Sequence, residues 1–209
     1  MYLKRKVDKY LSEWYEAPDH KPLIIKGARQ VGKTESIMRF AEIHYENVIY
    51  INFALDKKYR VITEDGYTVE AVNKAISRID PSKSFAPGKT LLFFDEIQDH
   101  PDIATALKAY CIDRKYDVIC SGSLLGIFYK KIESNSVGYK TDYTMRSLDF
   151  EEFLWAKGYD DGLKADLLKS MMDGVPLSAS LVQVMSEVFL DYVIVGGMPA
   201  VVLEYVRSG

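Results

Sequence analysis

Short runs of consecutive apolar residues alternate along the chain with longer stretches in which apolar residues recur every three or four positions. The short runs are typical of strands that are covered on both faces, and the longer stretches are typical of amphipathic helices. The expected strands are 23–25, 48–53, 90–94, 117–120 and 137–148. The expected helices are 3–16, 33–45, 69–79, 101–114 and much of the chain after 150. This alternation predicts an α/β domain with a mainly parallel sheet.

The pattern of the last third of the chain predicts helices. Its most apolar stretch, 181–195, is interrupted by polar residues, so it predicts a buried amphipathic helix and not a membrane span. A soft boundary near residue 157 separates an expected core, 1–157, from a helical lid or connector, 158–209. The stretch 198–206 has an apolar face that either packs back on the domain or is covered by further chain. We expect the second, so that the lid precedes another C-terminal domain.

Composition excludes several classes of protein. The 209 residues carry 27 basic and 30 acidic side chains, a formal net charge of −3, which argues against a uniformly basic nucleic-acid surface but allows a local patch. The two cysteines, Cys111 and Cys120, predict buried thiols of a reduced, cytoplasmic protein. The three histidines are scattered, without the paired spacing of a zinc site. We therefore expect a cytoplasmic protein that needs neither a disulfide nor zinc.

The strongest chemical signal is a loop between the first expected strand and the helix after it. It reads Gly27, Ala28, Arg29, Gln30, Val31, Gly32, Lys33 and Thr34, followed by Glu35. This run fits GxxxxGK[ST], in which glycines allow positive φ and leave room for a phosphate. Backbone N–H groups and the helix N-terminus would attract the anion, Lys33 would bind the β- and γ-phosphates, and Thr34 would coordinate Mg²⁺. A chance glycine turn is the alternative, which the strand before the loop and the helix after it disfavour.

A second signal follows the most apolar strand. Asp95 and Glu96 stand at its carboxyl end, where a parallel sheet places its ligands. Asp95 is the candidate Mg²⁺ ligand, through water, and Glu96 is the candidate group that polarises the attacking water. Two acidic residues that merely end a strand are the alternative. Hydrolysis needs a group such as Glu96, and no guanine-reading N/TKxD motif occurs, so ATP is the expected nucleotide.

Two further roles have weaker candidates. Ser121, ahead of Ser123, could sense the γ-phosphate or the attacking water from the end of the fourth strand, although a serine-glycine turn is the simpler interpretation. An arginine finger could be Arg78, Arg114 or Arg146, and each of these is more often a surface ion-pair partner. The sequence does not choose among the three.

Six segments taken together resemble one family. They are GARQVGKT, YINF, FFDEIQ, VICSGSLL, LDFEEFL and GGMPAVV, in this order along the chain. The chain resembles the prokaryotic AAA+-type ATPases in which the nucleotide-binding core precedes a C-terminal domain of unknown function. The resemblance implies a P-loop NTPase fold of the ASCE/AAA+-like class, with sheet order 5-1-4-3-2 and a C-terminal helical extension. It also implies Lys33, Thr34, Asp95 and Glu96 in the roles given above, with ATP and Mg²⁺ as ligands.

The chain departs from that family at two places. Many members carry arginine after the glycine that matches Gly138, whereas this chain has Tyr139 and then Lys140. Ser147 stands where they have proline before the LSFEEF box. The first change puts a finger or phosphate-sensing role of that loop in doubt.

Three functions follow as hypotheses. The first is an ATPase core whose hydrolysis drives a conformational change on an unidentified protein or nucleic-acid partner, with no membrane involved. An oligomer could then supply the arginine finger. The second is a nucleotide-gated switch with negligible hydrolysis. The third is an accessory ATPase of a DNA-handling system, which the acidic net charge disfavours.

Overall fold

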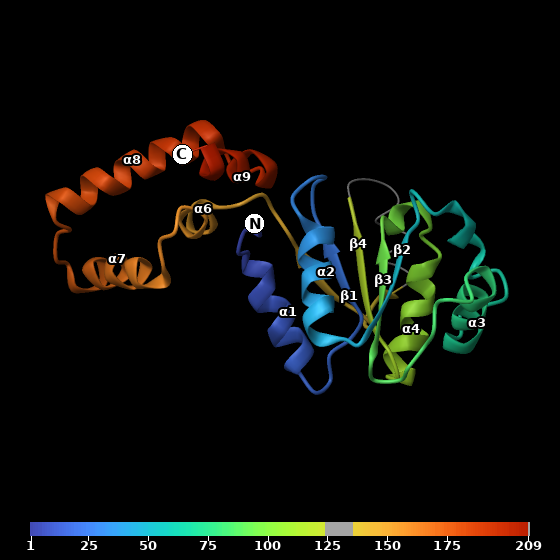
Figure 1. Ribbon diagram of the computed structural model, residues 1–209. Helices are drawn as coiled ribbons and strands as arrows, with labels where there is room; N and C mark the ends of the chain where they lie inside the picture. Colours follow the sequence, from blue (N-terminus) through green and yellow to red (C-terminus); the bar gives the residue numbers. More distant parts are fainter. Residues whose placement is uncertain (124–135, 209) are drawn as a thin grey trace. The chain divides into compact units, whose positions relative to one another are not determined.

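The computed structural model describes residues 1–123 and 136–208, and the chain forms two compact units. One unit, Lys9–Met145, contains the sheet, and the other combines Met1–Asp8 with the chain from Arg146 on (Figure 1). Residues 146–157 therefore lie outside the sheet-containing unit, whereas the expected core extended to 157. The role of the later helices as a lid or connector stays a prediction.

The sheet has five parallel strands in the order β2-β3-β4-β1-β5. Their bounds are Leu23–Lys26 for β1, Asn47–Asn52 for β2, Thr90–Asp95 for β3, Asp117–Gly122 for β4 and Thr141–Thr144 for β5. This is the predicted order 5-1-4-3-2, so the predicted fold class is confirmed. All strands run the same way, and their carboxyl ends consequently meet at one edge.

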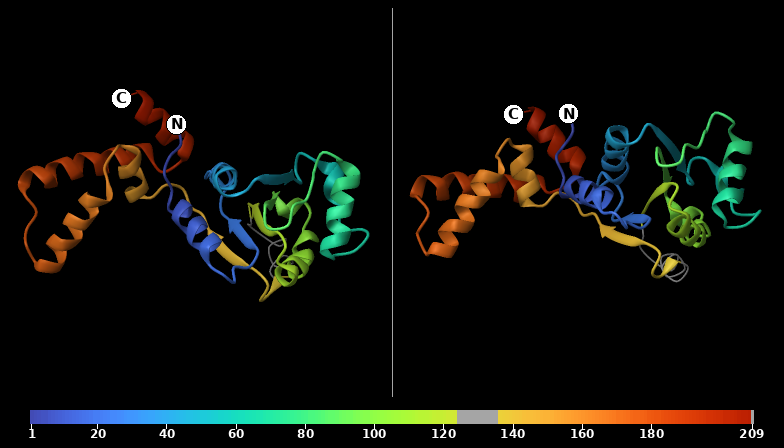
Figure 2. Two further views of the ribbon diagram at one scale, coloured as in Figure 1. Left: turned by 60° about the horizontal axis from the view of Figure 1, so that its bottom comes forward. Right: turned by 90° about the horizontal axis from the view of Figure 1, so that it is seen from below.

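Helices cover both faces of the sheet (Figures 1 and 2). They are α1 Lys6–Glu16, α2 Lys33–His44, α3 Val69–Ile79 and α4 Ile103–Asp113, with short 3₁₀ helices η1 Lys57–Val61 and η2 Ile97–Asp99. Crossovers between parallel strands are right-handed, and the chain reverses its direction across the sheet after β2. The crossover helix α2 therefore lies on one face, and α3 and α4 lie on the other.

Strand β3, which lies between β2 and β4, is buried along its whole length, as its unbroken apolar run predicts. Leu92 and Phe94 belong to the core that the sheet forms with α3 and α4. Phe93 points to the opposite face, where its ring contacts Tyr50 of β2 at a centroid distance of 5.1 Å. Because side chains alternate along a strand, Asp95 points to the same face as Phe93, the face that α2 covers.

The strand expected over 137–148 is shorter than its pattern suggested. Only Thr141–Thr144 pairs as β5, in parallel with β1. Gly138 has φ 80° and the N–H of Tyr139 bonds to the carbonyl of Ser136, so the chain turns before the strand begins. At the other end, the N–H of Leu148 bonds to the carbonyl of Gly197 at 2.7 Å, which takes this residue away from the sheet.

The second unit is helical. Its helices are α6 Phe150–Ala156, α7 Asp161–Asp173, α8 Ala179–Val195 and α9 Pro199–Ser208. Phe153 is fully buried in its core, together with Leu148, Val188 and Val202. The LDFEEFL and GGMPAVV segments thus meet in one hydrophobic cluster.

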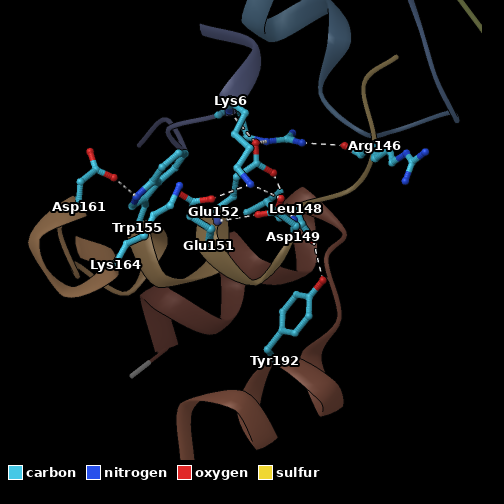
Figure 3. A network of polar contacts seen from close by, with 11 residues as sticks. Lys6, Arg146, Leu148, Asp149, Glu151, Glu152, Trp155, Asp161, Lys164 and Tyr192 are labelled. Carbon is cyan, nitrogen blue, oxygen red and sulfur yellow. Dashed lines mark hydrogen bonds and ion pairs between the residues drawn. The ribbon is translucent and has the colours of Figure 1, made fainter. Parts of the chain in front are cut away.

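A polar network joins the N-terminal residues to α6 within this unit (Figure 3). Asp149 and Glu152 form a capping box at the start of α6. The Nε of Arg5 lies 3.1 Å from Oε1 of Glu152, and each residue is 5% exposed. The backbone N–H of Lys6 donates to the same oxygen at 2.7 Å, and its ammonium pairs with Asp149 and Glu151. Two segments far apart in sequence are therefore held by a buried ion pair.

The prediction that 181–195 forms a buried amphipathic helix is wrong in one respect. The segment is helical in α8, but Val188 is the buried residue of that helix, while Phe189, Leu190 and Ile194 are at least half exposed. Helix α8 carries apolar side chains on most of its sides, and only one side packs against other helices, so the remaining apolar side chains stay exposed. In the part of the chain that the structure describes, no helix has the length and apolar character that crossing a bilayer requires.

The two cysteines differ in burial, against the prediction that both are core thiols. Cys120 on β4 is fully buried, and burial raises the pKa of its thiol. Cys111 follows Tyr110 on α4 and is only partly buried, because Tyr110 occupies the side of the helix that faces the sheet.

Candidate functional site

The carboxyl ends of three adjacent strands bring the candidate residues together. Since β4 lies between β1 and β3, the loop after β1 meets the residues that end β3 and β4. The loop leads directly into α2, whose first residue is Lys33. The site thus combines a helix N-terminus with two strand ends.

The loop turns into α2 through two residues in the left-handed region. Gln30 has φ 64° and Gly32 has φ 93°. Gly32 is the N-cap residue, and its carbonyl accepts the first helical hydrogen bond, from the N–H of Ser36 at 3.1 Å. The N–H groups of the first turn of α2 have no partner within the helix, so they can bind an anion. Of the other predicted nucleotide-binding residues, Val31 is buried, and Ala28, Arg29 and Glu35 are exposed.

Gly27 is required for a reason that the motif alone does not show. Its φ is not positive. A Cβ at this position would lie 2.1 Å from the carbonyl oxygen of Met145, just beyond β5. The N–H of Met145 also bonds to the carbonyl of Lys26 at 2.7 Å. The close approach of the β5 end therefore excludes a side chain at Gly27.

Lys33 folds back over the loop. Its ammonium donates to the carbonyl oxygens of Gly27, at 3.0 Å, and Ala28, at 2.7 Å, and the residue is only 7% exposed. Burial lowers the pKa of Lys33, while the negative charges of Glu96 and Asp95 oppose this shift. The ammonium is thus held by neutral carbonyl oxygens that an incoming anion can replace.

Asp95 is the most densely hydrogen-bonded carboxylate of the site and is 2% exposed. The donors to its Oδ2 are Thr34 Oγ1 at 2.9 Å, Tyr50 OH at 3.1 Å and Asn52 Nδ2 at 3.3 Å. The donors to its Oδ1 are the N–H of Glu96 at 2.9 Å and Ser121 Oγ. These donors hold the carboxylate in one orientation.

Tyr50 and Asn52 were not predicted as site residues. They stand two positions apart on β2, so both point to the face that α2 covers, and Asn52 lies directly opposite Asp95 in the sheet register. One signal could have found them: they are polar residues at alternate positions of an apolar strand, next to the strand that ends in Asp95. That β2 lies beside β3 was implied only by the expected sheet order.

Glu96 leaves the end of β3 in an unusual backbone conformation. It has φ 54°, which turns the chain into η2. Its Oε2 accepts a hydrogen bond from Nε2 of Gln98 and a longer one, 3.4 Å, from Oγ of Ser123. Ser121 and Ser123 therefore contact different carboxylates, Asp95 and Glu96 respectively.

The candidate arginines lie elsewhere. Arg78 pairs with Asp65 at 3.3 Å, and Arg114 pairs with Asp19 at 2.6 Å at the amino end of β4. The side chain of Arg146 is exposed. Within residues 1–123 and 136–208, no hydrogen bond or ion pair joins these arginines to Lys33, Asp95 or Glu96. Leu124 and Leu125, which end the VICSGSLL segment, lie outside the described residues.

The fold and the position of the loop define the class of protein. A parallel sheet in this order, with the loop between β1 and α2 and an acidic residue at the end of β3, is that of the AAA+ P-loop NTPases. The family model of the AAA domain matches residues 19–154, and the chain belongs to this family of P-loop ATPases. No curated protein is similar enough in sequence to count as a match.

The solved structures that match this chain are distant from it in sequence. PCH-2 of C. elegans is 11% identical with a TM-score of 0.45, covering 84% of this chain and 49% of that one. The Aeropyrum pernix ORC1 protein, solved in complex with DNA, is 13% identical with a TM-score of 0.44, covering 80% and 53%. Drosophila ORC bound to DNA is 12% identical with a TM-score of 0.47, covering 78% and 48%. The chain thus spans about half the length of the solved chains that it matches.

Proposed function

We propose that this chain binds ATP with Mg²⁺ at residues 27–35, which are the loop after β1 and the first turn of α2, and hydrolyses the bond to the terminal phosphate. The observation that carries the proposal is the hydrogen bond of 2.9 Å between Thr34 Oγ1 and Asp95 Oδ2. It joins the first turn of α2, where an anion would bind, to the one buried carboxylate at the end of β3. A site for phosphates and a site for a cation therefore adjoin.

Phosphate binding falls to the loop and Lys33. The backbone N–H groups of the loop and the N-terminus of α2 bind the phosphate oxygens. Lys33 exchanges its bonds to the carbonyls of Gly27 and Ala28 for bonds to the β- and γ-phosphates. This exchange favours the charged ammonium, because a phosphate is anionic and a carbonyl is neutral.

The residues at the cation position suit Mg²⁺. Thr34 and Asp95 offer hydroxyl and carboxylate oxygens, the ligand types that Mg²⁺ prefers, and Mg²⁺ commonly retains several waters. Bound Mg²⁺ would neutralise charge on the phosphate oxygens. Tyr50, Asn52 and Ser121 orient the Asp95 carboxylate through their hydrogen bonds.

Glu96 supplies the group that hydrolysis requires. Its carboxylate is partly exposed, so water can reach it, and one of its oxygens is already held by Gln98 and Ser123. We assign it the role of orienting the attacking water and accepting its proton. Ser121 bonds to Asp95, and we assign it the role of responding to the presence of the γ-phosphate.

Hydrolysis then changes the contacts at the ends of β3 and β4, and we propose that this change acts on a protein or nucleic-acid partner through the helices after residue 157. An arginine finger from a neighbouring subunit, or from further chain, would complete the site. ATP is preferred over GTP because no N/TKxD motif occurs in the sequence.

The test is Mg²⁺-dependent ATP turnover by the full chain. Lys33→Ala should weaken nucleotide binding, and Glu96→Gln should retain binding and lose turnover. The matched controls are Lys74→Ala and Glu70→Gln, which remove the same groups from exposed positions on α3. Absence of nucleotide binding by the parent chain would refute the proposal.

A nucleotide-gated switch is the second candidate. It is favoured by the positions of Arg78 and Arg114, whose ion pairs are with surface carboxylates. Tight Mg²⁺-dependent ATP binding without turnover, at every protein concentration tested, would select the switch. A turnover rate per protein molecule that rises with protein concentration would instead show that a neighbouring subunit supplies the arginine finger.

A further inference from the structure

Gln98 contacts the candidate catalytic carboxylate through a side-chain amide of defined orientation. Its Nε2 donates to Oε2 of Glu96 and lies 3.4 Å from Oδ2 of Asp99. Both neighbours are carboxylate oxygens, which accept hydrogen bonds and cannot donate them when ionised. The amide nitrogen must therefore face Glu96, because the opposite orientation would bring the amide oxygen against a negative charge.

The other end of the same amide has no hydrogen-bond partner in the described part of the chain. Among the described residues, none donates a hydrogen bond to Oε1 of Gln98, although this atom is buried. A buried acceptor without a donor costs stability. Gln98 is thus poorly suited to stabilise the fold through its polar group, yet it is well placed to hold Glu96.

The backbone beneath Gln98 is firmly anchored. Ile97 is fully buried, and Asp99 forms an ion pair of 2.9 Å with Arg60. Arg60 is itself held by the carbonyl of Phe53, at 2.8 Å and 3.0 Å. Gln98 therefore stands between two fixed residues of η2, and its short reach to Glu96 is set by the backbone.

We propose that Gln98 is a positioning residue for ATP hydrolysis and holds the Glu96 carboxylate where it can orient water. This inference rests on the proposed function. A glutamate side chain has several rotatable bonds, and a base that samples many positions meets the attacking water less often. Gln98 holds Oε2, and no described residue forms a hydrogen bond with Oε1 of Glu96, so this oxygen can contact the water.

The first test is Gln98→Met, which has a similar size but neither the donor nor the unpaired acceptor. We expect kcat for ATP to fall about ten- to a hundredfold, with the Kd for ATP and the urea midpoint unchanged. The matched control is Gln183→Met on α8, where the amide also donates to a carboxylate, that of Glu187 at 3.2 Å. This control should retain full activity.

The second test is the double variant of Gln98→Met with Glu96→Gln. If Gln98 acts through Glu96, the double variant is no slower than Glu96→Gln alone. Gln98→Glu is the back-up should Gln98→Met fold poorly. It keeps the shape, replaces the donor by a second carboxylate, and should lower kcat to a similar extent.

The outcomes separate the two proposals. If Gln98→Met has an unchanged kcat while Glu96→Gln is inactive, the proposal for Gln98 is overturned and the proposed function is not. A loss of stability that parallels the loss of kcat, with additive effects in the double variant, also overturns it. Full turnover by Glu96→Gln, or ATP binding by the parent chain without turnover at every protein concentration tested, overturns both proposals.

Discussion

Replacement of Gly27 by alanine separates two reasons for a glycine at the start of the loop. The motif assigns this glycine to the phosphate, whereas the structure shows the end of β5 against it. The added Cβ would lie 2.1 Å from the carbonyl oxygen of Met145 and 3.1 Å from its carbonyl carbon. Contacts of a Cβ below 3.0 Å essentially never occur, so the two backbones must separate by about 1 Å.

The cost can be worked from these contacts. Forcing an extra carbon into a packed site costs about 1–3 kcal/mol. The shift also strains the 2.7 Å hydrogen bond from the N–H of Met145 to the carbonyl of Lys26, worth about 1 kcal/mol. Gly27→Ala should therefore lower the free energy of unfolding by about 2–4 kcal/mol, without any nucleotide present.

Urea unfolding, followed by tryptophan fluorescence, measures this loss. Trp14 is buried in the sheet-containing unit, so a Trp155→Phe background makes the signal report on that unit. With a slope of about 2 kcal/mol per molar, the midpoint should fall by about 1–2 M. Gly162→Ala, measured in a chain that retains Trp155 of the same helical unit, is the control, because the atoms nearest to its added Cβ belong to the flexible carboxylate of Asp160. An unchanged midpoint in Gly27→Ala, with nucleotide binding lost, would show that only the phosphate requires this glycine.

Three further predictions concern single contacts. Ser121→Ala removes one donor to the β3 carboxylate and should lower ATP turnover roughly tenfold with binding retained, which nucleotide titration and steady-state rates can check. The hydrogen bond with Asp117 raises the pKa of His20 in the folded chain. The contact between protonated His20 and Asp117 therefore stabilises the fold in full below about pH 6.5, and this stabilisation is lost as the pH rises through the folded-state pKa of His20. Urea midpoints should accordingly fall between pH 6 and pH 8.5, and His20→Gln should remove this part of the slope. Arg5→Met leaves the buried carboxylate of Glu152 without its ion pair and should destabilise the helical unit by about 3–5 kcal/mol, measured by urea unfolding; a change below 1 kcal/mol would contradict this reasoning.

The sequence alone predicted the features that depend on local pattern. The unbroken apolar run of β3 requires cover on both faces, and residues 69–79 are helical as their spacing indicates. The GxxxxGK[ST] loop lies between a strand and a helix because its glycines and the flanking apolar runs are adjacent in the chain. Asp95 directly follows an apolar run, so its position at the end of a strand was also predicted from the sequence, and with it the candidate cation ligand. The order of the strands came from the family resemblance and is confirmed by the pairing.

Only the tertiary structure decided features that depend on residues distant in sequence. Tyr50 and Asn52 join the site because β2 pairs with β3, and the short reach of Gln98 to Glu96 depends on the left-handed turn between β3 and η2. Gly27 is restricted by Met145, a residue far along the chain. The exposed faces of α8 are as apolar as those of a buried helix. Their exposure could not be predicted from the sequence, because burial depends on what packs against a surface and not on the surface itself. A periodic pattern shows which face is apolar, and only the folded chain shows which partner meets it.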